Sequence, residues 1–143
     1  MKGVNRIYAV IDTNVIVSAL ITSNKESNPN KVVKAINIGN IIPIYNDEIE
    51  SEYKRVLHYP KLKITEEQIN TFISTLRKLG IKVDRTKIDD ETFPDPADIV
   101  FYEVRMSVDD SYLVTGNQKH FPVKPFIVTP TQMVEILRER KLI

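Results

Sequence analysis

The stretch that decides the fold is Ile7-Tyr8-Ala9-Val10-Ile11-Asp12-Thr13-Asn14. Its first five residues are apolar or aromatic without a break, and the run stops at Asp12. Such a run is typical of a strand buried on both faces, as in a parallel sheet covered by helices. Asp12 then lies at the carboxyl end of the strand, where open α/β sheets build their sites. An equally good interpretation of this stretch alone is that Asp12 or Asn14 only caps a helix that begins near Val15.

Strand and helix patterns alternate along the rest of the chain. Apolar residues at helical spacing predict helices over residues 15–20, 31–38, 47–57 and 66–79, with two more opening near 97 and at 130. Short apolar runs predict strands over residues 41–45, 81–83, 112–115 and 126–129, and Pro43 suggests an edge position or a strand start for the first of these. The alternation predicts an α/β fold with a parallel sheet. The length of the chain predicts one domain, residues 1–143.

The composition is that of a globular protein, with 42% hydrophobic and 27% charged residues. Twenty Lys and Arg residues balance nineteen Asp and Glu residues, so the net charge of +1 gives no global attraction to nucleic acid. The absence of cysteine excludes disulfides, thiol catalysis and zinc sites with cysteine ligands. The two histidines, His58 and His120, stand apart and form no zinc motif. Without a long apolar segment, we expect a cytoplasmic protein that does not contact a membrane.

Carboxylates recur where a site could form, and each also has a structural interpretation. Glu52 and Glu50 flank opposite edges of the apolar stripe of the 47–57 helix, so helical spacing does not choose between them. For either one, the simplest role is a solvated helix face. Asp95 and Asp98 suit a helix start, as N-cap and first-turn residue, and that role is favoured over metal binding for each alone. The two roles can coexist at a helix N-terminus that faces the site.

Asn117 follows the predicted strand that ends near Thr115. It is either a turn residue or a neutral oxygen ligand at the same sheet edge as Asp12. Several acidic or amide side chains at one edge, without cysteine, indicate a site for a hard cation such as Mg²⁺ or Mn²⁺. Such a cation suits phosphodiester hydrolysis, because it lowers the pKa of a bound water and neutralises phosphate charge.

Other phosphate chemistries can be compared with this one. The spacing of the glycines excludes a P-loop and a Gly-x-Gly-x-x-Gly motif. A phosphatase of the haloacid-dehalogenase type, with Asp12 as nucleophile, is an alternative because these enzymes also begin with an apolar strand that ends in Asp. They typically carry a second Asp two residues later, where this chain has Asn14. Such an enzyme should hydrolyse a generic phosphomonoester, and a nuclease should not.

Four segments, in order, resemble the motifs of PIN-domain ribonucleases. They are Val10-Ile11-Asp12-Thr13-Asn14-Val15, Glu52-Tyr53-x-x-Val56-Leu57, Asp95-Pro96-Ala97-Asp98-x-x-Phe101 and Tyr112-Leu113-Val114-Thr115-Gly116-Asn117. The closing segment Ile127-Val128-Thr129-Pro130-x-x-Met133 is similar to the prokaryotic branch identified as toxin components of toxin–antitoxin pairs (VapC-like). The resemblance covers nearly the whole chain.

The resemblance implies a three-layer α/β/α fold with a central parallel sheet. It also implies cleavage of single-stranded or structured RNA with Mg²⁺ or Mn²⁺. By match, Asp12, Glu52 and Asp98 are the catalytic residues and metal ligands, which favours Glu52 over Glu50. A cognate antitoxin protein, and a homodimer or higher homo-oligomer, are further implications of the resemblance.

Supporting roles follow from the same match. Thr13 and Asn14 would shape the site, and Thr115 would support it. Asn117 departs from the family, because many PIN domains carry Asp there. One negative charge is thereby lost, so a second metal should bind less tightly. We therefore expect a one-metal or Mn²⁺-preferring nuclease with reduced activity. Asp95 could compensate in part.

A catalytically weakened PIN domain that binds RNA or a partner protein is therefore an alternative function. RNA contact would need a local basic surface, because the net charge supplies no attraction. The candidate basic residues are Lys61, Lys63, Arg77, Lys78, Lys82, Arg85 and Lys87.

Overall fold

The computed structural model describes residues 6–143, and over these residues it contains one five-stranded parallel sheet in the order β3-β2-β1-β4-β5. The strands are β1 (Ile7–Ile11), β2 (Ile41–Tyr45), β3 (Ile81–Lys82), β4 (Tyr112–Val114) and β5 (Ile127–Val128). β1 is central, and all of its residues except Tyr8 are buried. The parallel α/β fold predicted from the apolar run is therefore confirmed.

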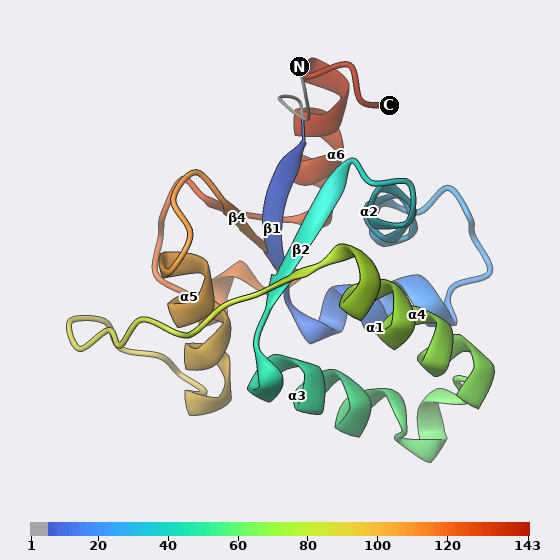
Figure 1. Ribbon diagram of the computed structural model, residues 1–143, viewed down its shortest axis with the longest axis horizontal. Coiled ribbons are helices and arrows are strands. Elements are labelled where there is room, and N and C mark those ends of the chain that lie inside the picture. The colour runs from blue at the N-terminus through green and yellow to red at the C-terminus, as the bar shows by residue number, and fades with distance from the viewer. Residues whose placement is uncertain (1–5) are drawn as a thin grey trace.

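The sheet lies between two layers of helices (Figure 1). The helices are α1 (Thr13–Ile21), α2 (Asn28–Asn37), α3 (Asp47–Leu57), α4 (Glu66–Leu79), α5 (Ile99–Met106) and α6 (Pro130–Glu139). The chain passes from β1 outward to β3 and then returns to the other side of β1 for β4 and β5. Because parallel crossovers are right-handed, this reversal places α5 on one face, against β1, β2 and β4, and α2 and α4 on the other.

Two predicted helix starts are confirmed. The Asn46 side chain accepts a hydrogen bond from the backbone N–H of Ile49 and caps α3. Thr65 and Gln68 form a reciprocal capping box at the start of α4, so two backbone donors are satisfied. These local motifs fix where α3 and α4 begin, and hence where the carboxylates of α3 lie.

Three local predictions were wrong. α1 begins at Thr13, two residues before the predicted start, directly after Asp12. α2 begins at Asn28, before the predicted start at residue 31, because Ser27 caps it and a proline occupies its first turn. β2 is neither an edge strand nor started by Pro43, since it lies between β1 and β3. β3 pairs only with the last two residues of β2, so that ladder begins after the proline.

Tyr53 anchors α3 to the centre of the sheet. Its ring is fully buried and packs edge-on against Phe72 of α4. Its hydroxyl donates a hydrogen bond to the backbone carbonyl of Ile11, the last residue of β1. The contact holds α3 beside the carboxyl end of β1, immediately before Asp12. Within residues 6–143, no helix is long and apolar enough to cross a bilayer.

Candidate active site

The carboxyl ends of β1 and β4 meet where the strand order reverses, which is where open α/β sheets bind ligands. Asp12 follows β1 directly and Thr115 follows β4 directly. The Thr115 hydroxyl donates to Asp12 Oδ2 at 2.7 Å, and the Asp12 backbone N–H donates to the Val114 carbonyl at 2.9 Å. Side chain and backbone of Asp12 are thus both fixed by the neighbouring strand.

Asn14 adds a second link between the two strand ends. Its side-chain nitrogen donates to Asp12 Oδ2 at 3.3 Å, and its Oδ1 accepts from the backbone N–H of Gly116 at 3.1 Å. A Cβ at position 116 would lie 3.3 Å from that same Oδ1, so glycine leaves room for the close approach. Asn14 and Thr115 together hold one orientation of the Asp12 carboxylate.

The Asp12 carboxylate is in an unfavourable place for a negative charge. It is only 6% exposed, and burial raises its pKa to about 6. The hydrogen bond from Thr115 opposes this rise, whereas the nearby charge of Asp98 adds to it. Because the charged form is desolvated, a bound cation would stabilise it strongly.

Asp98 reaches the same place from the start of α5. The predicted helix start is confirmed: Asp95 accepts from the Ala97 backbone N–H at 3.0 Å, and a single 3₁₀ turn, η2 (Pro96–Asp98), leads into α5. Burial, followed by the charge of Asp95, raises the pKa of Asp98, and the charge of His120 opposes the rise. Asp98 is therefore a second acid whose charge is poorly compensated.

A cavity of about 440 Å³ opens between these residues. Most of the predicted site residues line it, namely Asp12, Thr13, Asn14, Asp95, Asp98 and Asn117. Thr115 is fully buried beneath it and bonded to Asp12. The sequence-predicted residues from β1, α1, η2 and the segment after β4 thus converge on one cavity.

Glu52 is not among the residues that line the cavity. Its carboxylate accepts a hydrogen bond from Arg55 at 2.7 Å, although its charge still contributes to the raised pKa of Asp98. Glu50 forms ion pairs with Arg77 and Lys54, which hold the pKa of its carboxyl group at about 2. Across residues 6–143, no three Asp, Glu, His or Cys side chains lie close enough together to hold a metal ion. The ligand role of Glu52 therefore stays a prediction.

His120 is a site residue that sequence reasoning missed. It belongs to η3 (Gln118–His120), and its Nδ1 lies 3.2 Å from Asp98 Oδ2. Its Nε2 lies 3.0 Å from the side-chain nitrogen of Asn117. The sequence feature that could have suggested His120 is its position three residues after Asn117, in the turn that follows a strand. Nothing in the sequence linked this turn to Asp98.

The oxygen atoms around the cavity fit a hard divalent cation. Thr13 Oγ1 is buried and has no hydrogen-bond partner among residues 6–143, and the buried Asp98 Oδ2 has no hydrogen bond there apart from the 3.2 Å contact with His120 Nδ1. Unpartnered buried oxygens are uncommon and point to a missing water or ion. With the desolvated Asp12 carboxylate and the amide of Asn117, they form a set of oxygen donors, which Mg²⁺ and Mn²⁺ prefer.

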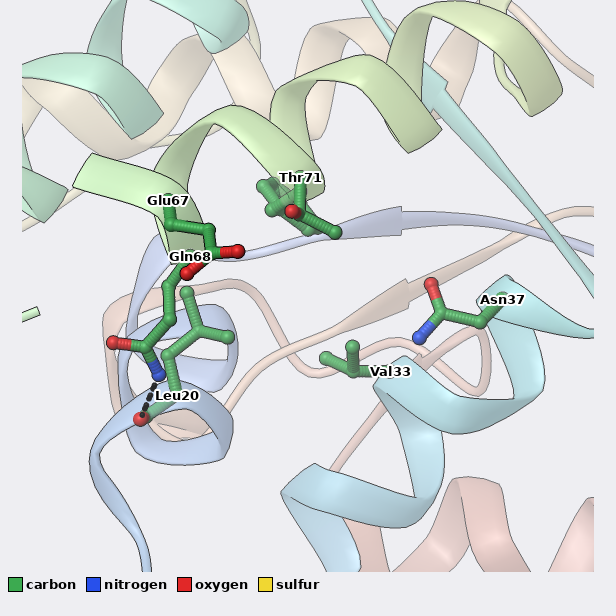
Figure 2. Close-up of a pocket in the computed structure, with 7 residues that line it drawn as sticks. Leu20, Val33, Asn37, Glu67, Gln68 and Thr71 are labelled. Atoms are coloured by element: carbon green, nitrogen blue, oxygen red, sulfur yellow. Dashed lines mark hydrogen bonds between the residues drawn. The ribbon is translucent and has the colours of Figure 1, made fainter. Parts of the chain in front are cut away.

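A second cavity, of about 270 Å³, lies between α1, α2 and α4 (Figure 2). Leu20, Val33 and Phe72 contribute apolar side chains to it, and Gln68 donates to the Leu20 carbonyl at 3.2 Å. Among the described residues that line it, Glu67 is the one carboxylate. Without converging acids, this cavity offers no comparable chemistry, so the site is the cavity at the strand ends.

Comparison with known proteins shows which family the chain belongs to. A family model described as a PIN domain matches residues 8–119 of the 143 residues. The matched segment begins in β1 and ends in η3, so it includes every predicted site residue. Comparison with curated proteins gives no significant match. Because the family model covers most of the chain, including the sheet edge with Asp12 and Asp98, the chain belongs to the PIN domain family.

Proposed function

We propose that this protein is a metal-dependent endoribonuclease that hydrolyses phosphodiester bonds of RNA. PIN domains are generally nucleases, which supports hydrolysis of nucleic acid. The observation that carries the proposal is the pair formed by the desolvated carboxylate of Asp12 and the largely buried carboxylate of Asp98, which line one cavity at the strand ends.

Asp12 and Asp98 would hold Mg²⁺ or Mn²⁺ through carboxylate oxygens, with Glu52 as the third carboxylate. When bound, the cation supplies a more acidic water and neutralises charge on the phosphate. Thr115 and Asn14 keep the Asp12 carboxylate in one orientation. Glu52 must leave Arg55 to join the two acids, and the exposure of Arg55 makes that ion pair weak.

The biological role that we propose is that of the toxin in a toxin–antitoxin pair. It is supported by the similarity of the closing segment, residues 127–133, to that branch of PIN domains. A cognate antitoxin, a homodimer or higher homo-oligomer and a cytoplasmic location belong to the same proposal. Expression of the chain should then arrest growth, and expression of Asp12→Asn should not.

The function is tested by RNA cleavage with purified protein in chelator, Mg²⁺ or Mn²⁺. We expect cleavage that requires metal and is lost in Asp12→Asn, together with no turnover of p-nitrophenyl phosphate. Turnover of that phosphomonoester would favour the phosphatase alternative instead. RNA binding without cleavage in either metal, with cleavage appearing in Asn117→Asp, would favour the weakened PIN domain.

A further inference from the structure

One wall of the active-site cavity comes from the segment that joins α3 to α4. Tyr59, Lys61 and Leu62 line the cavity on this side, while Asp12 and Asp98 line the acidic side. The segment contains the 3₁₀ turn η1 (Pro60–Leu62) and lies outside the sheet. Its side chains therefore face the place where a phosphodiester would sit, without belonging to the acidic set.

Tyr59 is held in a defined position, although it is 36% exposed. Its backbone N–H donates to the Val56 carbonyl at 3.0 Å, and Pro60, with its fixed φ, follows it. The Arg55 guanidinium lies 5.7 Å from the ring centroid and donates a hydrogen bond to the hydroxyl. The ring is thus an ordered aromatic surface at the mouth of a cavity whose nearby wall includes Val56 and Leu62.

Lys61 is the one basic candidate among the described residues that lines this cavity. Four other basic candidates are engaged in ion pairs: Arg77, Lys82, Arg85 and Lys87. Lys61 lines the cavity and, within residues 6–143, has no carboxylate within ion-pair distance. A lysine next to a site for a phosphodiester, and not neutralised by the protein, is suited to contact a phosphate.

We propose that Tyr59 stacks on an unpaired base of the RNA and that Lys61 contacts an adjacent phosphate. This inference rests on the proposed nuclease function and names the part of the chain that holds its substrate. Stacking on an aromatic ring is the way in which proteins hold single-stranded nucleic acid without reading its sequence. A cavity of about 440 Å³ has room for one nucleotide beside the acids.

The experiment measures binding without cleavage, in the Asp12→Asn background and in chelator. Two labelled probes are compared by fluorescence anisotropy: an octauridylate and an abasic ribose-phosphate oligomer of the same length. Tyr59→Ala should weaken octauridylate binding by between about fivefold and about 150-fold, the range for one lost stacked base, and leave binding of the abasic oligomer unaffected. Tyr59→Phe, which keeps the ring but loses the hydroxyl bond to Arg55, should recover most of the octauridylate binding that Tyr59→Ala loses.

Lys61→Ala should weaken the binding of both probes alike and make the negative slope of log K against log salt shallower by about 0.7, as for one lost phosphate contact. Lys25→Ala, an exposed lysine that does not line this cavity, serves as the matched control. The inference would be overturned if Tyr59→Ala weakened the binding of both probes equally or of neither. It would also be overturned if the parent protein did not bind octauridylate.

Cleavage by the wild-type chain is measured separately, so the two proposals fail in different ways. Metal-dependent cleavage without base-dependent binding at Tyr59 leaves the nuclease intact and overturns the stacking role. Base-dependent binding without cleavage in either metal supports Tyr59 and overturns the nuclease.

Discussion

The hydroxyl of Thr115 donates a hydrogen bond of 2.7 Å to Asp12 Oδ2, joining residues 103 positions apart. The bond connects the ends of the two strands on either side of the switch point. It also opposes the rise in the pKa of Asp12 that burial causes. Thr115 therefore fixes the orientation of the central carboxylate and favours its charged form.

Removal of this bond should damage the site more than the fold. Thr115→Val keeps the shape of the side chain but leaves Asp12 without its shortest hydrogen bond, and we expect the pKa of Asp12 to rise above about 6. RNA cleavage should fall, and its acidic limb should move to higher pH. Thr115→Ser, which keeps the hydroxyl, is the control. A wild-type pH profile in Thr115→Val would contradict this role.

Asp12 itself should reduce stability at neutral pH when no metal is bound. Its folded-state pKa of about 6 lies above the ordinary value of 3.8, so the folded state binds the proton more tightly than the unfolded state. Stability from this group is present below pH 3.8 and is lost as the pH rises through about 6. Asp12→Asn should therefore be more stable at pH 7.5, by up to about 3 kcal/mol.

Urea unfolding in chelator at pH 3.5 and pH 7.5 measures this difference. The two proteins should have nearly equal free energies of unfolding at the lower pH and diverge at the higher one. An Asp12→Asn protein that is less stable than wild type at pH 7.5 would show that the carboxylate is not desolvated as the structure indicates.

Asn117→Asp should strengthen metal binding. The residue lines the cavity with Asp12 and Asp98, and a carboxylate there adds a negative charge next to their oxygens. Titration calorimetry with Mn²⁺ should give an affinity higher by about tenfold or more, because opposite charges at contact distance interact by several kcal/mol near a protein surface. Asn117→Ala should not gain affinity. Equal affinity in Asn117→Asp and wild type would count against the proposed ligand set.

Glu52 and Glu50 provide a matched pair for the third ligand. Glu52→Gln should reduce metal-dependent cleavage, whereas Glu50→Gln should leave cleavage close to wild type. The reason is that Arg77 and Lys54 bind Glu50, while the charge of Glu52 reaches Asp98. Rates with saturating Mn²⁺ compare the two variants. A larger loss in Glu50→Gln would reverse the assignment.

Tyr53→Phe should cost stability, because it removes the hydroxyl that bonds to the Ile11 carbonyl in a fully buried place. An unpaired buried polar group costs about 1–3 kcal/mol. Urea unfolding measures the change, with Tyr112→Phe as the control, since the hydroxyl of Tyr112 meets only an exposed arginine, Arg140. Equal stability of Tyr53→Phe and wild type would mean that this bond does not anchor α3.

Local signals in the sequence were sufficient for much of the fold. The apolar run before Asp12 predicted a buried strand, and apolar residues at helical spacing predicted α4 over residues 66–79. The strand order was not predictable in this way, because it depends on which strands pair across the chain. The edge position predicted from Pro43 was wrong for the same reason. An inner strand can contain this proline because β3 is short and pairs only with the residues after it, and local sequence does not predict that pairing.

In the candidate site, too, local sequence predicted some residues, while the roles of others depend on tertiary packing. Asp12, Asp98 and Asn117 could be expected at one sheet edge, since each lies near a predicted strand end or helix start. The contact of His120 with Asp98 could not be predicted, because it depends on how the turn after β4 packs against the start of α5. Glu52 contacts Arg55 and does not line the cavity, and helical spacing fixes neither of these side-chain arrangements.

The most direct test of the account is a crystal structure of the protein with Mn²⁺, in which anomalous scattering locates the metal. We predict a peak in the cavity at the strand ends, within bonding distance of Asp12 and Asp98, that is lost in Asp98→Asn. Manganese bound elsewhere, or an empty cavity at Mn²⁺ concentrations that support RNA cleavage, would contradict the assignment of these two carboxylates as the metal site.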